Sequence, residues 1–367
     1  MSPRLDNPSG SAWFGGVLAT GVVEVSHDVA VLDGGGWWAV VITFEGEVRL
    51  WRFAHRRPAP LPPPRCPWPG LPGTWTTSLD RPGYVAGVHE IRRRIHEGEV
   101  YQVNLCRLVS TDVPPLDDAA NDPWALAQVL AAGNPAPYAG VIDVPALDGH
   151  PAARVVSASP ELFLRRDGEV IASSPIKGTG VTVADLLPKD TAENVMIVDL
   201  VRNDLQHTCR PGTVEVTGLL EVEHHPGLVH LVSTVQGRLA DQAGWTELLA
   251  ATMPPGSVSG APKSSALRAI TDLEPVPRGP YCGAVGWVDA DAGTATLAVG
   301  IRSFWWDGGR LWFGTGAGIT WGSDPDGEWA ETELKAARLV GLASQTAGEH
   351  GASGAGHGAE SRRGVRQ

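Results

Sequence analysis

The chain has 367 residues, and its 41 acidic and 29 basic side chains give a net charge of -12. This balance argues against a general nucleic-acid or anionic-membrane binder, so we expect small molecules or proteins as partners. The four cysteines are scattered without a Cys-x-x-Cys pair, which suggests neither a zinc site nor a disulfide framework and is typical of reduced thiols in the cytoplasm. No signal pattern opens the sequence, and no apolar run approaches the roughly 20 residues that a membrane helix requires.

Residues 1–80 predict a short β-rich subdomain with a proline-rich loop. β-branched and aromatic residues alternate here with glycine and aspartate turns, which predicts strands at 22–25, 37–42 and 48–51. Prolines dominate residues 55–73, so we expect an extended linker or surface loop there.

Residues 81–343 predict the main domain, and its first helix is expected over 84–99, where apolar residues recur at helical spacing. Strands and helices mixed with hairpin turns predict an α+β fold with antiparallel sheets flanked by helices. Residues 344–367 are rich in Gly, Ala, Ser and charge, so we expect a disordered tail. The further strands are expected at 155–164, 170–173, 297–305 and 311–313, and the further helices at 190–205, 245–251, 262–273 and 325–342.

One predicted hairpin brings an acid and an amine together. Asp167-Gly168 predicts a two-residue turn of the type that needs positive φ. Pairing Arg166 with Glu169 places Glu161 and Lys177 at the open end of this hairpin, roughly 10 Å apart. The pair is able to flank one small substrate, whereas the competing interpretations are a surface lysine and an exposed strand-end carboxylate.

Two predicted helices carry further carboxylates. Asp190 is the expected N-cap of the first, and Glu193 three residues later completes a capping-box pattern. The second places Glu328, Glu331 and Lys335 on one face. These carboxylates suit a hard cation such as Mg²⁺, although a cap and a Glu331–Lys335 surface pair explain them equally simply.

Two glycine-bearing segments are candidate anion sites. Residues 253–263 predict a turn running into a helix, whose free N–H groups favour an anion. Strand alternation puts Arg302 on the face of Ala298 and Gly300, where its guanidinium is able to clamp a carboxylate. The glycines of 316–318 permit close backbone approach to the same ligand.

These motifs occur in the order seen in chorismate-utilising enzymes. The resemblance covers roughly residues 84–341 and is closest to component I of aminodeoxychorismate synthase, because residues 175–179 read Pro-Ile-Lys-Gly-Thr, whereas relatives that make anthranilate carry alanine at the lysine position. It implies two antiparallel β-sheets packed as a twisted sandwich flanked by helices, with the active site in a cleft between them. The matching segments are 101–105, 159–161, 175–179, 193–204, 230–233, 256–263, 283–286, 301–302 and the glutamate-rich last helix.

The resemblance implies a Mg²⁺-dependent conversion of chorismate and ammonia to 4-amino-4-deoxychorismate, which leads toward 4-aminobenzoate, folate or a specialised metabolite. Lys177 is the expected nucleophile at ring carbon C2, Glu161 the general acid for the departing C4 hydroxyl, and His230 a further catalytic residue. The implied metal ligands are Glu193 and Glu331, with Glu328 assisting through water. The implied substrate contacts are Ser257, Gly260, Arg302, Gly316, Gly318 and Lys335.

The expected partner is a separate glutamine amidotransferase subunit, because no Gly-x-Cys-x-Gly nucleophile motif occurs in the chain. We therefore expect the chain alone to use free ammonia. The Leu-Leu-Glu-Ser motif of tryptophan-regulated relatives is also missing, since residues 219–222 read Leu-Leu-Glu-Val and lie in the wrong region.

Three alternatives compete with this interpretation. Anthranilate synthase is the strongest, and Lys177 together with the missing tryptophan motif speaks against it. The pattern of isochorismate and salicylate synthases has lysine at the position of Gln102 and alanine at the position of Lys177. In this chain the lysine is at the other of the two positions. A non-catalytic chorismate-binding paralogue is expected to have lost at least one of Glu161, Lys177, Glu193 and Glu331.

Overall fold

A computed structural model describes residues 10–71, 73–115, 121–147, 149–180, 182–185, 188–225 and 228–345. Nearly all of the tail that we expect to be disordered lies outside these residues. Among the described residues, no helix is long and apolar enough to cross a membrane.

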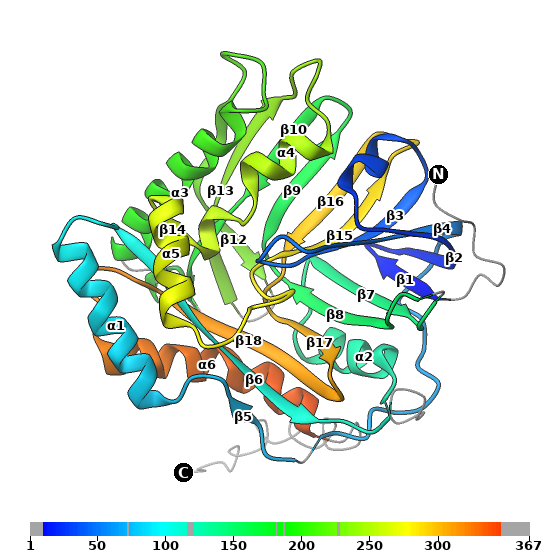
Figure 1. The fold of residues 1–367 in the computed structure, drawn as a ribbon, viewed down its shortest axis with the longest axis horizontal. Coiled ribbons are helices and arrows are strands. Elements are labelled where there is room, and N and C mark those ends of the chain that lie inside the picture. Colours follow the sequence, from blue (N-terminus) through cyan, green and yellow to red (C-terminus); the bar gives the residue numbers. More distant parts are fainter. Residues whose placement is uncertain are drawn as a thin grey trace, which may run out of the picture.

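The strands join into one large antiparallel sheet that curls on itself (Figure 1). Hydrogen-bonded neighbours run from β6 through β18, β17, β8 and β7, then β1, β2, β4 and β3, and finally β15, β16, β9, β10, β13 and β12. Strands β5 and β14 pair with β6, and β11 pairs with β13. The antiparallel α+β fold is thus confirmed, and the two expected sheets are continuous with each other through β1, β2 and β4.

The strands are bounded as follows: β1 Ser11–Phe14, β2 Val17–Ser26, β3 Trp37–Ile42, β4 Val48–Pro58, β5 Thr76–Thr77, β6 Gln102–Asp112, β7 Tyr138–Val144, β8 Ala153–Ser159, β9 Leu162–Asp167, β10 Val170–Ser174, β11 Ile176–Gly180, β12 Glu215–His225, β13 Leu228–Arg238, β14 Gly260–Ala261, β15 Ala284–Asp289, β16 Thr294–Val299, β17 Ser303–Asp307 and β18 Arg310–Ile319.

Six α-helices of the described chain cover the curled sheet. Helices α1, α2, α5 and α6 pack on the β6–β7 half, whereas α3 and α4 lie with the half that contains β13. Asp80, Asp122 and Asp324 cap α1, α2 and α6, each followed by a proline in the first turn, so the sequence itself sets where these helices begin. The bounds are α1 Arg81–His96, α2 Pro123–Gly133, α3 Pro188–Gln206, α4 Trp245–Thr252, α5 Lys263–Leu273 and α6 Pro325–Ser344.

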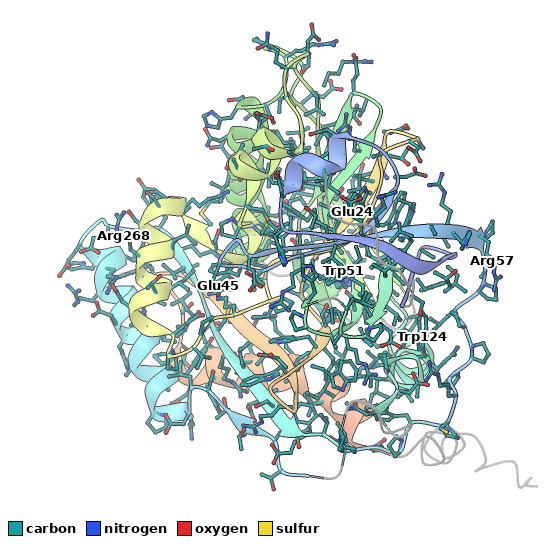
Figure 2. All side chains as sticks on the ribbon, turned by 45° about the vertical axis from the view of Figure 1, so that its right-hand side comes forward. Glu24, Glu45, Trp51, Arg57, Trp124 and Arg268 are labelled. Carbon is teal, nitrogen blue, oxygen red and sulfur yellow. The ribbon has the colours of Figure 1, made fainter. Side chains whose placement is uncertain are left out.

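The apolar core is divided between the two faces of the sheet. Trp51 on β4 and Trp124 on α2 are buried in separate clusters (Figure 2). The proline-rich segment also contributes, because Trp68 is 1% exposed and its indole N–H donates to the carbonyl of Ala343 at 2.8 Å. This segment, expected to be a linker or surface loop, therefore packs against the end of α6.

The N-terminal strands belong to the same sheet as the rest of the chain. β1 pairs with β7, and β3 pairs with β15 through all six of its residues from Trp37 to Ile42. The domain boundary expected near residue 80 stays a prediction, but hydrogen bonds cross it at both places.

Candidate functional site

A cavity of about 580 Å³ opens between the β6–β18 pair, the β11–β13 pair and helix α6. All but one of the site residues predicted from the sequence line this cavity. Those present are Glu161, Lys177, Glu193, His230, Ser257, Arg302, Gly316, Gly318, Glu328, Glu331 and Lys335. The strand ladder and α6 therefore bring residues that are up to 174 positions apart in sequence (161 to 335) to one site.

Glu161 is a buried acid in this cavity. It follows Pro160 in the short link between β8 and β9, and it is 4% exposed. Burial raises the pKa of its carboxyl, while hydrogen bonds from the Ser257 hydroxyl and the Ile176 N–H and the positive charges of Lys177 and Arg302 act in the opposite direction. A carboxyl held in this way is suited to donate a proton.

Lys177 lies on β11, the strand that follows the hairpin. Its neighbour Ile176 pairs with Val232, and the register shifts before Thr179 pairs with His230. Lys177 is half-buried and lines the cavity, and its charge acts on Glu161. An amine and an acid therefore face the same enclosed volume.

The hairpin register differs from our expectation. Asp167 pairs with Val170 and Ile171 pairs with Arg166, so the turn is Gly168-Glu169 rather than Asp167-Gly168. Gly168 adopts φ +60 as the first turn residue, which glycine tolerates without strain. An irregularity between Ala172 and Ser174 then offsets part of the shift, so the open end of the hairpin still carries Glu161.

Three carboxylates reach the cavity from two helices. Glu193 projects from α3, and Glu328 and Glu331 project from α6. Glu328 is 8% exposed and accepts a hydrogen bond from Ser323 at 2.6 Å, whereas Glu331 forms a 2.6 Å ion pair with Lys335. The oxygen-rich donor set fits a hard cation such as Mg²⁺.

The expected capping role of Asp190 is wrong. Helix α3 begins at Pro188, so Asp190 is the third helical residue and not the N-cap. The proline at the first position sets the start instead.

Arg302 reaches the cavity by a different route from the one expected. The predicted strand breaks after Val299, and Arg302 adopts φ +51 in the link between β16 and β17. A Cβ at Gly300 would lie 2.0 Å from the carbonyl oxygen of Pro280, so this glycine serves backbone packing and not a bound group. Burial, together with the charge of Arg338, lowers the pKa of Arg302.

His230 and the 3-10 turn η4 (Gly256–Val258) complete the enclosed side of the cavity. His230 on β13 is 2% exposed, and Ser257 in η4 is 5% exposed. Gly260 does not line the cavity: it adopts φ +144, and a Cβ there would lie 2.3 Å from the carbonyl oxygen of Gln102. Its geometry supports close pairing of β14 with β6 rather than the substrate contact we expected.

Several cavity residues were not nominated from the sequence. Helical spacing was a usable signal for Arg338, which lies seven residues after Glu331 and three after Lys335 and so shares their helix face. Others carried no such signal, because the fold brings them in from separate segments. Among them are Asn104 and Cys106 on β6, Thr315 on β18, Asn134 at the end of α2, and Tyr281 and Cys282 in the turn before β15.

Comparison with known proteins places this site in a family. Residues 45–341 match the model of the chorismate binding enzyme family. Component 1 of an anthranilate synthase from Haloarcula marismortui is 36% identical over 75% of this chain and 56% of its own length. Component 1 of the aminodeoxychorismate synthase of Salmonella typhimurium is 33% identical over 76% of this chain and 61% of its own length.

The solved structure of anthranilate synthase component I from Streptococcus pneumoniae superposes with a TM-score of 0.72 at 24% identity, covering 92% of this chain and 91% of that one. This likeness supports the fold. The chain spans less than two thirds of the two curated relatives, 56% and 61% of their lengths. The matched segment includes every residue of the cavity, and the chain belongs to the chorismate binding enzyme family.

Proposed function

We propose that this chain is component I of an aminodeoxychorismate synthase, which converts chorismate and ammonia to 4-amino-4-deoxychorismate with Mg²⁺. The observation that carries the proposal is the placement of Lys177 and the buried Glu161 in one cavity, with the lysine charge acting on the acid. The name of the Salmonella typhimurium relative supports the same activity.

The proposed reaction uses these two side chains in sequence. The unprotonated amine of Lys177 adds to ring carbon C2, both ring double bonds shift by one position, and the C4–O bond breaks. Glu161 donates a proton to the departing hydroxyl, which leaves as water. Ammonia then bonds to C4, both ring double bonds shift back, the C2–N bond to Lys177 breaks, and a proton from the new amine restores Glu161.

The carboxylates on α3 and α6 suit the metal site of this proposal. Mg²⁺ is commonly held by one or two protein carboxylates together with substrate oxygens and water. Within the described residues, no group of three or more His, Cys, Asp or Glu side chains is placed to hold an ion by itself, so the proposed site depends on oxygens from the substrate and water. Glu193, Glu328 and Glu331 would hold the ion, which would supply positive charge to offset that of the substrate carboxylate.

The cations of the cavity suit a substrate with two carboxylates. Arg338 is close enough for its charge to lower the pKa of Arg302, and Lys335 lines the same cavity. Guanidinium groups bind carboxylates through paired hydrogen bonds, so this cluster is the proposed anchor for one carboxylate of chorismate.

Anthranilate synthase is the second candidate, and the name of the Haloarcula marismortui relative favours it. It would require ammonia to add at C2, the carbon that Lys177 occupies in our proposal. A lysine at this position of the cavity therefore favours addition at C4. A non-catalytic paralogue is disfavoured because Glu161, Lys177, Glu193 and Glu331 all line the cavity.

We further propose that ammonia comes from a separate glutamine amidotransferase in the cytoplasm. The sequence carries no Gly-x-Cys-x-Gly motif, and burial raises the pKa of the cavity thiol of Cys106, which disfavours the reactive thiolate.

The test is product identification. The purified chain is incubated with chorismate, MgCl₂ and ammonium chloride at pH 8.5, and the products are separated and identified by mass and retention time. The proposal predicts 4-amino-4-deoxychorismate. Anthranilate as the main product would favour the second candidate, and unchanged chorismate would favour a binding protein.

A further inference from the structure

The segment between α4 and α5 carries the hydroxyl that touches the proposed general acid. Ser257 lies in the turn η4 (Gly256–Val258) and lines the same cavity as Glu161, where its hydroxyl favours the ionised form of the Glu161 carboxyl. The position of this turn therefore decides how closely the hydroxyl approaches Glu161.

One lysine ties the two ends of this segment to a neighbouring helix. Lys263, the first residue of α5, places its Nζ 2.6 Å from Oδ2 of Asp204 on α3. The same Nζ donates to the carbonyl of Thr252, the last residue of α4, at 3.3 Å. The side chains of Lys263 and Asp204 are 19% and 9% exposed, so water screens this ion pair little.

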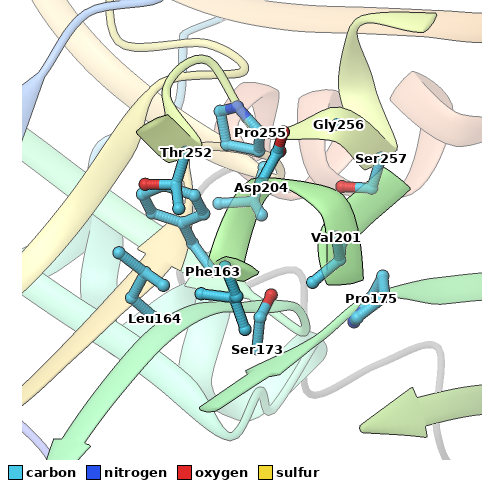
Figure 3. A pocket seen from close by; sticks show the side chains of 12 residues that line it. Phe163, Leu164, Ser173, Pro175, Val201, Asp204, Thr252, Pro255, Gly256 and Ser257 are labelled. Atoms are coloured by element: carbon cyan, nitrogen blue, oxygen red, sulfur yellow. The ribbon is translucent and has the colours of Figure 1, made fainter. Parts of the chain in front are cut away.

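A small cavity of about 20 Å³ lies directly beneath the turn (Figure 3). Asp204, Thr252, Gly256 and Ser257 surround it, and it has room for about one water molecule. Beside this space Leu200 of α3 packs closely against the turn, because a Cβ at Gly256 would lie 2.6 Å from Leu200 Cδ2. The Asp204–Lys263 pair adds a polar tie between the same helix and the two ends of the segment.

The opposite side of the turn is held by hydrogen bonds to main-chain oxygens. Asn104 donates to the carbonyl of Ser257 at 3.2 Å, and Arg278 donates to the carbonyl of Val258 at 2.9 Å. These bonds hold the main chain of the turn itself, whereas the Asp204–Lys263 pair holds the two ends of the segment against α3.

We propose that the Asp204–Lys263 ion pair is a positioning device that holds Ser257 against Glu161 and thereby aims the acid at the C4 hydroxyl. The role given to Glu161 rests on the proposed function. Neither Asp204 nor Lys263 is placed in contact with the reacting atoms, so both act through Ser257. Removing one partner leaves a buried charge without its counter-charge and unties both ends of the segment from α3, so the turn is held less firmly.

The experiment compares Asp204→Asn, Ser257→Ala and the double variant, with Asp143→Asn as the matched control. Asp143 forms a 3.1 Å ion pair with Arg154 of similar burial, 16% and 17% exposed, between β7 and β8 and outside the cavity lining. Activity is measured as chorismate consumption, so the comparison holds whichever product forms. Product identity alone tests the proposed function.

We expect Asp204→Asn and Ser257→Ala each to lower kcat by roughly 10- to 100-fold, the scale of a misplacement of about 1 Å, with little change in KM. The double variant should be no slower than the slower single variant, because Asp204 acts through Ser257. Asp143→Asn should lower the melting temperature by about as much as Asp204→Asn does, but it should leave kcat unchanged. The proposal would be overturned if the kcat losses of the two single variants multiply in the double variant. It would also be overturned if Asp204→Asn keeps full activity, or if Asp143→Asn loses as much kcat as Asp204→Asn.

A second readout does not require activity. Amide hydrogen exchange of residues 253–262 should be faster in Asp204→Asn than in wild type and unchanged in Asp143→Asn. Equal exchange in all three proteins would contradict the positioning role. Lys263→Met breaks the same pair from the other side, so it provides the same comparisons if Asp204→Asn does not fold.

Discussion

Replacing Glu161 by glutamine separates the acid function of this side chain from its packing. Glu161 is 4% exposed and accepts hydrogen bonds from the Ser257 hydroxyl and the Ile176 N–H. Glutamine has nearly the same volume, and its carbonyl oxygen is able to accept both bonds. We therefore expect the fold and chorismate binding to survive, while the donated proton is lost.

The expected loss of activity follows from the proposed role. Positioned general acids contribute typically 10²- to 10⁴-fold to rates. Glu161→Gln should lower kcat by this factor, which corresponds to about 3 to 5 kcal/mol in the activation free energy, with little change in KM.

The stability of the same variant should depend on pH with a defined sign. Burial raises the pKa of Glu161 above its ordinary value of 4.5. Wild type therefore keeps its full stability below that value and loses part of it as pH rises through the folded-state pKa, because the buried carboxyl must ionise. Glutamine does not ionise, so the melting temperature of wild type should fall relative to the variant as pH increases from about 4.5 toward neutrality.

Two assays check these expectations. Initial rates of chorismate loss give kcat and KM. Thermal melts across this pH range give the difference in stability between wild type and variant. If glutamine itself lowers stability by a constant amount, the change of this difference with pH is unaffected. A variant that keeps more than a tenth of wild-type kcat would refute the role of Glu161 as general acid. A stability difference that does not change with pH would refute its raised pKa.

Three further predictions concern the metal, the nitrogen source and the carboxylate anchor. Glu193→Gln and Glu331→Gln should each abolish turnover without changing the circular dichroism spectrum, and full activity of EDTA-treated, metal-free enzyme would exclude the magnesium role. The isolated chain should form aminated product with ammonium but not with glutamine, and glutamine-dependent product from the homogeneous chain would show that no amidotransferase partner is needed. Arg302→Ala removes charge-assisted hydrogen bonds worth about 1.5 to 3 kcal/mol, so KM for chorismate should rise roughly 10- to 100-fold, whereas an unchanged KM would place the substrate carboxylates elsewhere.

The sequence predicted the helices better than the strands. The aspartate cap and first-turn proline of α6 gave its start correctly, whereas α1 begins at Arg81 and not at 84, and α2 was not predicted although it has the same signal. Strands β12 and β13 were missed, because their stability comes from pairing with each other and with β10 and β11, which no local pattern records. The expected strand over 297–305 is two strands, since Arg302 adopts φ +51 in the link between them.

The sequence identified site residues correctly where the chemistry explains why a motif carries that residue type. Lys177 between Pro175 and Gly178 and the glutamates of α6 both line the cavity, although the hairpin register used to place Lys177 was wrong. Gly260 shows the limit of motif matching. It lies against Gln102 because of residues that are distant in sequence, and the local sequence around Gly260 does not reveal this contact. Cys106 on β6 and Cys282 in the turn before β15 approach each other, which spacing along the chain does not reveal.

The most direct test of the central proposal is the product made by Lys177→Ala with chorismate, Mg²⁺ and ammonium, compared with wild type by mass and chromatography. If Lys177 is the nucleophile that directs nitrogen to C4, the variant should make no 4-amino-4-deoxychorismate, or should make anthranilate slowly by direct addition of ammonia at C2. If the variant makes 4-amino-4-deoxychorismate at a near wild-type rate, Lys177 is only an electrostatic contact and the covalent mechanism is wrong.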